Sequence, residues 1–528
     1  MTEAQALLSM TEHIFAGVDR LISNFNQRTL SDELYNEIIK EYDNDYCSLL
    51  IRIIQLDSEE GLSAKLSGTM SSSSALLLID DKNFKATNFL IYVLLQIALD
   101  FKHVMSSFLG SKHIGDFNSL LFSQSADSKT LCMYFDVLHK FLTSSWSSPD
   151  TIEFASIVDM AMHLSSAHIA SKELQVSEKC CVVTEFILSR VNTTKYLPPF
   201  MAEIQKYRVA DGDARDDLKS QILMRYAVVL ACVLGSGESQ CDACIDSGAT
   251  DIIMTLCNSN DILLQLVALD DLLIHFASTK TGVHYLFASG MINWLVTCAS
   301  GENSDGGLEP DPLLSVECLR VVGQIFSGIS KHNISVDSIL ISQDYRQLMM
   351  QILAASFTHL DTFSDSSRLA GIGTLSDYAS SSHIALEAVV SDKKLLFAWI
   401  SLLQSKVEVQ SAVLHSLAAV MNSTATTIDS SSGAINDDSL IGACRDMKKK
   451  ILETIGEVKN QNPIEYLIKT ARQPIVDLSA GAYDLLIALS KQSGWGVQVV
   501  AASKGLRGFL EDRDTEVRVA PLYLLSLY

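Results

Sequence analysis

Two Ser-Gly breaks, each followed by a short apolar helix, constrain the fold of this chain more than any other feature. The first break is Ser247-Gly248 and the second is Ser289-Gly290, so the two lie 42 residues apart. Between them runs the segment Leu266–Ala277, which has apolar residues at helical spacing. Units of about 40–47 residues built from helix pairs or triplets are typical of HEAT and armadillo arrays, in which each unit buries its apolar stripe against its neighbours.

The Ala-Leu-x-x-Leu pattern of Ala268–Leu272 returns four more times toward the C-terminus, with spacings that drift from 42 to nearly 70 residues. The later copies begin at Cys318, Leu369, Ala412 and Ala482. Polar stretches between helices explain the drift: Asp57–Ser74, Lys206–Ser220, Gly301–Pro312 and Asn422–Ser439. The sequence therefore predicts an all-α fold, a HEAT/armadillo-like helical repeat solenoid. An irregular helical domain would share some of this spacing and stays the alternative.

Composition supports the helical prediction, because 528 residues contain only 8 prolines, and 48% of the residues are hydrophobic. We expect irregular N-terminal helical repeats in residues 1–235 and more regular repeats in residues 236–528. Helices are predicted over Ala4–Leu30, Ser31–Leu56, Asn88–Leu109, Thr130–Thr143 and Ile152–His168. The apolar segment Val517–Tyr528 lacks the polar outer face of a terminal repeat, which predicts a truncated C-terminus.

Charge restricts the class of partner. The formal net charge is −22 and the sequence pI is about 4.9, which disfavours nucleic acid and anionic membrane surfaces and favours a partner with a basic face. No signal peptide is visible, and the apolar stretch Phe89–Leu99, interrupted by Gln96, is too short to span a bilayer. We expect a cytoplasmic protein, with the nucleus as a second location, that contacts no membrane and is monomeric when free.

The sequence offers no catalytic or metal-binding constellation. Cys241 and Cys244 form a Cys-x-x-Cys without a second ligand pair, and His163 and His168 are five residues apart with no acid between them. No phosphate-binding loop, zinc-protease motif or nucleophile elbow is present. We predict a binding protein rather than an enzyme, with no cofactor and no metal.

The candidate binding residues lie between the core positions of the third helix of each unit, which lines the concave face of an armadillo array. With Ala268–Leu272 as the core frame, the exposed pairs are Asp271/His275, Val321/Ile325, Gly373/Asp377, His415/Ala419 and Asp484/Ala488. We expect Asp271, His275, Asp377, His415 and Asp484 to contact the partner. The Trp and Asn ladder of importin-α-like receptors is absent, so this acidic and apolar face fits a folded domain with a basic surface.

Three segments together resemble the family of the 26S proteasome non-ATPase regulatory subunit 5. They are Val267–Ile292, Gly371–Asp377, and Gln473–Leu486 followed by Gly494-Trp495. The resemblance covers approximately Ser236–Asp514. It implies an assembly chaperone that binds the C-terminal helical domain of a AAA ATPase subunit of the regulatory-particle base, together with other base assembly components. Such a chaperone is absent from the mature proteasome and has no catalytic residues.

This chain departs from the family pattern at its apolar C-terminus and in the enlarged loop Asn422–Ser439. A generic armadillo-repeat adaptor in trafficking or signalling is the alternative to the chaperone. The two differ in what they would recover from cytosol: free base ATPase subunits for the chaperone, import cargo or cytoskeletal proteins for the adaptor.

Overall fold

The computed structural model describes residues 128–143, 152–207, 217–259, 261–301, 311–332, 344–423 and 438–491, with a few single positions outside these ranges. Over the described residues the regular structure is helical, and no strand occurs. The all-α prediction is therefore confirmed for this part of the chain. The predicted helices Ala4–Leu30 and Ser31–Leu56 and the segment Val517–Tyr528 lie outside it, as does Asn88–Leu109 except for three positions.

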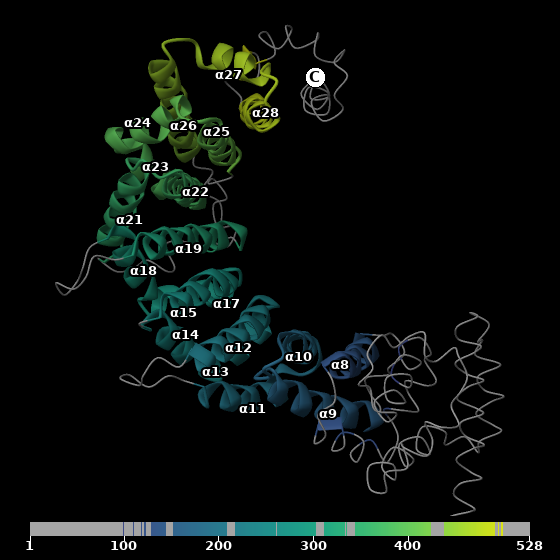
Figure 1. Ribbon diagram of the computed structural model, residues 1–528. Helices are drawn as coiled ribbons and strands as arrows, with labels where there is room; N and C mark the ends of the chain where they lie inside the picture. The colour runs from purple at the N-terminus through teal and green to yellow at the C-terminus, as the bar shows by residue number, and fades with distance from the viewer. Residues whose placement is uncertain are drawn as a thin grey trace, which may run out of the picture. The chain divides into compact units, whose positions relative to one another are not determined.

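The chain divides into two compact units, Met1–Val233 and Leu234–Tyr528. In unit 1 the helices are α8 (Ser128–Thr143), α9 (Ile152–His168), α10 (Leu174–Phe186), the π-helical turn η2 (Ile187–Val191), α11 (Thr193–Gln205) and α12 (Asp217–Gly235), which ends two residues inside unit 2. Unit 2 begins with α13 (Glu238–Asp246), α14 (Ala249–Cys257), α15 (Ile262–Val267), the π-helical turn η3 (Ala268–Leu273), α16 (Ile274–Ala277), α17 (Lys280–Ala288) and α18 (Met291–Ser300) (Figure 1). It continues with α19 (Pro312–Lys331), α21 (Asp344–Leu360), α22 (Asp365–Ser381), α23 (His383–Ser391), α24 (Lys393–Ser401), η4 (Leu402–Gln404), α25 (Val407–Asn422), α26 (Asp438–Lys459), α27 (Pro463–Ala471) and α28 (Val476–Ser490).

The two Ser-Gly breaks are left-handed turns between helices. Gly248 has φ +81° and joins α13 to α14, and Gly290 has φ +73° and joins α17 to α18. Glycine adopts this backbone conformation without the steric penalty of a Cβ atom. The helix restarts predicted from the 42-residue spacing are thus confirmed as chain reversals.

Five equivalent helices of unit 2 pack side by side and run parallel; we call them the third-helix row (η3 with α16, α19, α22, α25 and α28). Contacts along each neighbouring pair rise together in residue number, which fixes the parallel direction. From η3 and α16 to α19, Asp270 pairs with Arg320, and the backbone oxygen of Ser278 lies 2.8 Å from His332 Nε2. From α19 to α22, Thr374 Oγ1 donates to the backbone oxygen of Leu319 at 2.8 Å.

The remaining two pairs of the row follow the same direction. Asp365 and Ser376 of α22 contact Lys406 and Ser416 of α25, which are 41 and 40 residues further along the chain. Ser411 Oγ of α25 donates to the backbone oxygen of Asp477 on α28 at 2.9 Å, and His415 lies 3.0 Å from Asp484. Parallel, in-register stacking of equivalent helices is the defining property of a helical repeat solenoid, so unit 2 has that fold.

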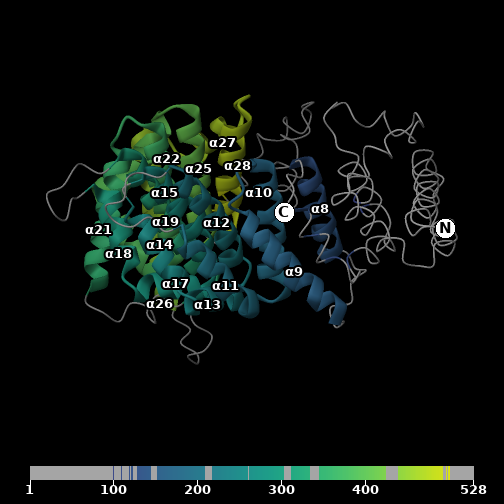
Figure 2. The ribbon, with the colours of Figure 1, turned by 60° about the horizontal axis from the view of Figure 1, so that its bottom comes forward.

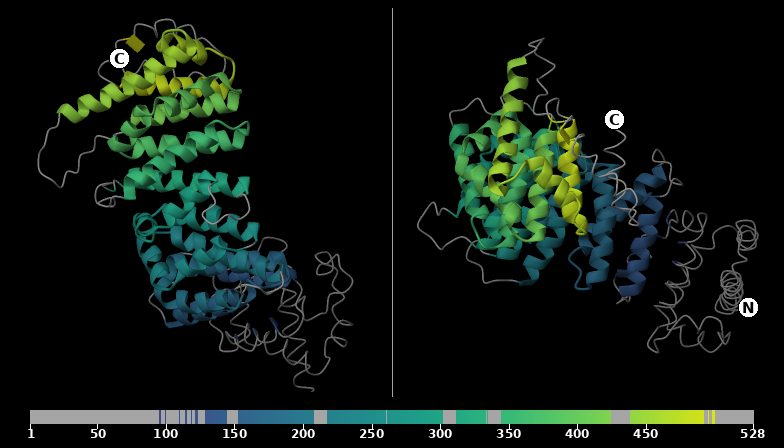
Figure 3. Two further views of the ribbon diagram at one scale, coloured as in Figure 1. Left: turned by 90° about the vertical axis from the view of Figure 1, so that its left-hand side faces the viewer. Right: turned by 90° about the horizontal axis from the view of Figure 1, so that it is seen from above.

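A second row covers the other side of unit 2. In Figure 1, α18, α21 and α24 lie opposite α19, α22 and α25, and the left panel of Figure 3 shows the helices stacked in layers. Figure 2 looks nearly along this stack, so that successive layers overlap. Both rows bury apolar stripes between them; Leu319, Phe326, Tyr378, Trp399 and Leu417 are at most 1% exposed.

A buried histidine fastens the two rows together. His359 of α21 is 6% exposed, and its Nε2 lies 2.9 Å from the backbone oxygen of Ala299 on α18. A carbonyl only accepts, so Nε2 carries the proton, and Nδ1 accepts from Ser367 Oγ of α22 at 2.6 Å. Burial lowers the pKa of His359, which keeps the imidazole neutral and both hydrogen bonds intact.

Unit 1 repeats the same principle in its described residues. Asp136 of α8 forms an ion pair of 2.7 Å with Lys179 of α10, and Asp159 of α9 accepts a hydrogen bond of 2.5 Å from the Tyr196 hydroxyl of α11. In unit 1, therefore, α8 contacts α10 and α9 contacts α11. The helices predicted over Thr130–Thr143 and Ile152–His168 correspond to α8 and α9.

Among the described residues, two helices are long and apolar enough to cross a membrane by length and composition: the Leu218–Gly235 part of α12 and Pro312–Lys331, which is α19. The bent combination of Ile262–Ala277 with Lys280–Ala288 also qualifies. Polar and charged residues interrupt both long helices, so neither is an unbroken apolar run in the sequence. In α19 the apolar residues Val321, Ile325 and Phe326 are fully buried against neighbouring helices, which accounts for its composition.

We expect Gly328→Ala to destabilise unit 2, because α16 and α19 touch at this glycine. A Cβ atom at Gly328 would lie 2.5 Å from the backbone oxygen of Ala277 and 2.9 Å from Val283 Cγ2. Overpacking of this kind costs about 1–3 kcal/mol. The matched control is Gly373→Ala on α22, where nothing lies within 4 Å, and it should gain about 0.5–1 kcal/mol from helix propensity. Urea unfolding followed by circular dichroism measures both; equal stability of the two variants would contradict the close packing of α16 on α19.

Candidate functional site

The third-helix row leaves one stripe of each helix exposed, and acidic residues predominate on these stripes. Each stripe repeats every three or four residues, as the uncovered side of a packed helix does. The exposed or half-buried acidic residues are Asp270, Asp271, Glu317, Asp365, Asp377, Glu408, Asp477 and Asp484, and the basic ones on the same helices are His275, Arg320, Lys331, Arg368 and His415. We call this set the acidic face.

Two ion pairs tie the acidic face across neighbouring helices. The Arg320 guanidinium of α19 pairs with Asp270 of η3 and, at 2.8 Å, with Glu317 one turn earlier on its own helix. His415 Nδ1 of α25 lies 3.0 Å from Asp484 Oδ2 of α28. All of these side chains except Glu317 are about half exposed. Exposed pairs contribute at most about 1 kcal/mol each, so they set geometry more than stability.

Small residues separate the charges on three of the helices. Gly373 on α22, Ala419 on α25 and Ala480 on α28 are exposed, and Ala370 and Ala412 are half-buried. Side chains this short leave the acidic carboxylates as the outermost polar groups and let the backbone of a partner approach the helices closely. The acidic face is therefore built for contact with another protein surface rather than for enclosing a small molecule.

Asp377 differs from the other acidic residues because it is largely desolvated. Its carboxylate lies beside Gly323 of α19, where a Cβ atom would be 3.4 Å from Oδ2, and burial raises its pKa to about 6. Asp271 is half-buried, and burial raises the pKa of this carboxyl as well. Asp377 therefore loses its negative charge as pH falls through about 6.

The structure separates the predicted contact residues into two groups. His415 and Asp484 are exposed and paired, whereas Asp271, His275 and Asp377 are partly covered. His275 Nδ1 lies 2.6 Å from the backbone oxygen of Asp271, and its ring covers Gly235. Whether any of them contacts a partner stays a prediction.

Two of the predicted exposed pairs were wrong. Val321 and Ile325 are fully buried, whereas Arg320 and Gln324 beside them on α19 are exposed; Ala488 of α28 is also buried. The cause is helical geometry: residues three, four and seven positions after a core residue lie on the same face, so Val321 and Ile325 extend the buried stripe that begins at Cys318. Sequence reasoning therefore missed Asp270, Glu317, Arg320, Glu408 and Asp477. Helical spacing counted from the core residues of α25 places Glu408 and His415 on one exposed stripe.

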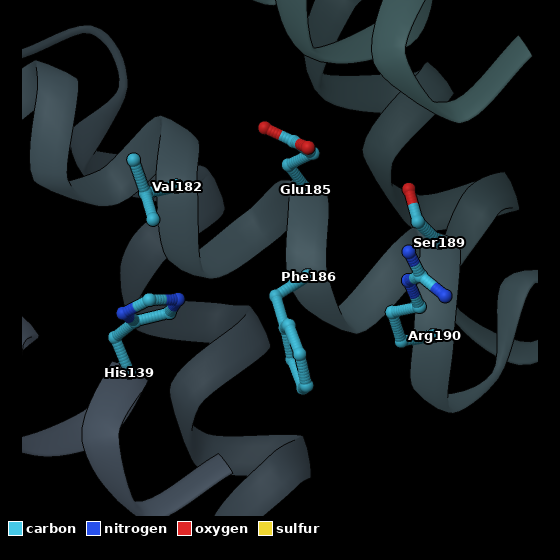
Figure 4. A pocket seen from close by; sticks show the side chains of 6 residues that line it. All are labelled: His139, Val182, Glu185, Phe186, Ser189 and Arg190. Atoms are coloured by element: carbon cyan, nitrogen blue, oxygen red, sulfur yellow. The ribbon is translucent and has the colours of Figure 1, made fainter. Parts of the chain in front are cut away.

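A separate pocket in unit 1, with a volume of about 460 Å³, lies between α8, α10 and η2 (Figure 4). Its lining consists of His139, Val182, Glu185, Phe186, Ser189 and Arg190. Figure 4 shows His139 and Ser189 at opposite ends with Phe186 between them, so they do not form a nucleophile–base pair. Burial lowers the pKa of His139, which leaves its imidazole neutral at neutral pH.

The Cys-x-x-Cys thiols lie in the core of unit 2. Cys241 and Cys244 of α13 are both fully buried, and Thr279 Oγ1 donates to Cys241 Sγ at 3.2 Å. Burial raises the pKa of Cys241 to about 11 and that of Cys244 to about 12, so both stay protonated thiols. Among the described residues no group of three or more His, Cys, Asp or Glu side chains could hold a metal ion.

No protein-family model matches this chain, and no curated protein matches it. Among solved structures, it is similar to an engineered protein from the Northeast Structural Genomics Consortium, with 16% identity, a TM-score of 0.40, and coverage of 86% of this chain and 97% of that one. It is also similar to a designed armadillo repeat protein, with 14% identity, a TM-score of 0.35, and coverage of 54% and 98%. A second designed armadillo repeat protein, in complex with the peptide (KR)4, has 16% identity, a TM-score of 0.36, and coverage of 54% and 97%. These likenesses are too weak to argue from, and the solenoid fold rests on the contacts described above.

We expect Asp377→Asn to stabilise the protein above neutral pH. The pKa of this carboxyl is about 6 in the folded protein and near 4 when unfolded, so folding binds a proton between these values. Its contribution to stability is therefore lost as pH rises from about 4 to about 6, by about 2–3 kcal/mol at most. Urea unfolding at a series of pH values should show Asp377→Asn matching the wild type near pH 4 and exceeding it at pH 7.5. Asp484→Asn, at an exposed site, is the control, and an equal gain there would contradict the effect of burial.

Chelators should leave folding unchanged. Cys241 is hydrogen-bonded to Thr279, and both thiols stay protonated, whereas zinc binds the thiolate. Melting curves with and without EDTA, together with metal analysis of the purified protein, check this. Stoichiometric zinc whose removal lowers the melting temperature would contradict it.

Proposed function

We propose that this protein is a non-catalytic helical-repeat scaffold whose acidic face binds the basic surface of a partner protein. The observation that supports it is the excess of acidic side chains on five consecutive parallel helices, where eight exposed or half-buried carboxylates face three Lys or Arg side chains and two histidines. A like-charged array of this kind attracts a basic surface, raises the association rate, and repels acidic competitors.

The resemblance in the sequence extends this proposal. We propose an assembly chaperone of the proteasome regulatory-particle base, acting in the cytoplasm and the nucleus, whose partner is the C-terminal helical domain of a AAA ATPase subunit. By covering that domain, a scaffold of this size would delay its other contacts until assembly advances. The solenoid fold itself supports binding equally well in an adaptor, so the partner distinguishes the two.

Charge reversal on the acidic face tests the binding proposal. The variant carries Glu408→Lys, Asp477→Lys and Asp484→Lys, all at exposed positions of α25 and α28. Asp377 is left unchanged, because a lysine in its desolvated site would test stability instead of binding. Exposed interfacial charges act mostly on the association rate, so we expect that rate to fall by at least about tenfold at low salt, and the deficit to shrink as salt is raised.

The matched control has the same change in net charge at exposed acidic residues off the row: Asp251→Lys, Asp446→Lys and Glu453→Lys. It should lose far less binding than the acidic-face variant. The partner is a purified free base ATPase subunit, and co-purification with mass spectrometry from cytosol accompanies the measurement. Recovery of base ATPases without the 20S core supports the chaperone, whereas import cargo or cytoskeletal proteins would support the adaptor. Equal binding by both charge variants would show that the acidic face is not the binding surface.

A further inference from the structure

An exposed apolar side chain stands at the start of each helix of the third-helix row. These residues are Leu263, Leu313, Phe363, Val407 and Val476, with exposures of 54%, 62%, 97%, 38% and 47%. Leu263 lies in the first turn of α15, which continues into η3; Leu313, Val407 and Val476 lie in the first turns of α19, α25 and α28; Phe363 lies two residues before α22. We call this set the apolar edge.

The contacts between helices place the members of the apolar edge side by side. Leu263 and Leu313 each lie seven residues before the partners of one ion pair, Asp270 and Arg320. Val407 follows Lys406, which pairs with Asp365, the first residue of α22 and two residues after Phe363.

The last two helices are aligned in the same way. Ser411 of α25 donates to the backbone oxygen of Asp477, so the first turns of α25 and α28 are in register, and Val407 and Val476 lie at neighbouring ends. Members of the apolar edge are therefore aligned at three of the four steps between neighbouring helices and are not a scatter of single exposed residues, which would need no explanation.

The apolar edge lies at the start of the same stripes that carry the acidic face. On α15 and η3, Leu263 precedes Asp270 by seven residues, which is two helical turns; on α25 and α28, Val407 and Val476 directly precede Glu408 and Asp477. On these helices a segment lying across the row meets an apolar side chain and a carboxylate on the same stripe. This combination fits one chemistry, an apolar residue flanked by cations.

We propose that the apolar edge and the acidic face together bind one extended basic segment of the partner that has an apolar residue at every third position. This inference rests on the proposed function: the segment belongs to the same partner and adjoins the folded domain that the acidic face is proposed to bind. Packed helices lie about 8–10 Å apart, and three residues of extended chain span about 10 Å, so each apolar residue reaches the next helix. Five helices then take up a segment of about 13 residues.

Two synthetic peptides of equal charge serve as probes. The first repeats leucine, lysine and arginine over about 13 residues, and the second has serine in place of every leucine. On the wild-type protein we expect both to bind and the leucine peptide to bind at least about tenfold more tightly, because partial burial of several apolar side chains suffices for that difference. The edge variant Leu313→Gln, Phe363→Ser and Val476→Thr should bind both peptides equally.

A matched control removes three apolar residues that are similarly exposed away from the apolar edge: Met254→Gln, Met350→Gln and Phe397→Ser. It should keep the preference for the leucine peptide, and circular dichroism should show that both variants are folded. Preference retained by the edge variant, or equal binding of the two peptides to the wild type, would overturn the inference while leaving the acidic face intact.

Failure of the proposed function gives a different result, in which neither peptide binds and Glu408→Lys, Asp477→Lys and Asp484→Lys together change nothing. A second copy of this chain is the alternative occupant of the apolar edge, and sedimentation of the free protein tests for it. A dimer that the edge variant dissolves would overturn the inference, because the apolar edge would then be a surface between two copies of this chain.

Discussion

The parallel, in-register packing of the third-helix row is the constraint on which the rest of unit 2 depends. Each helix of the row is covered by its two neighbours and by the second row, so only one stripe stays exposed, and that stripe must point the same way in every repeat. Close approach makes the register rigid: Gly328 leaves no room for a Cβ atom against Ala277. A surface repeated in this way extends with the number of helices, which is why a solenoid can offer a long binding face without a deep cavity.

Burial disfavours the charged form of a carboxyl, and the carboxyls of the acidic face are buried to different extents. At the α25–α28 step His415 and Asp484 contact each other in a position open to solvent. At the α19–α22 step Asp377 is desolvated beside Gly323, and its pKa rises to about 6. The face therefore loses negative charge at its centre as pH falls through about 6.

The interior of the repeats is fastened by polar groups that serve packing rather than chemistry. His359 satisfies a carbonyl on α18 and a hydroxyl on α22 as a neutral imidazole, and Cys241 accepts from Thr279 as a protonated thiol. Histidine and cysteine attract attention in a sequence because they can ligate metals or act as nucleophiles. Here the partners and the burial of both residues assign them to the core.

Local sequence alone determined the helical class, the turns at Gly248 and Gly290, and the repeat of Ala268–Leu272, because apolar periodicity, left-handed glycines and scarce proline act over a few residues. It also indicated His415 and Asp484 as exposed, since both lie on regular helices. The tertiary structure alone decided which face of α19 is buried and how far Asp377 is desolvated. The first depends on the helices that pack against α19, and the second on the approach of Gly323 from a helix about 50 residues away in the chain. The local sequence around α19 and Asp377 does not reveal either property, because both depend on contacts between repeats.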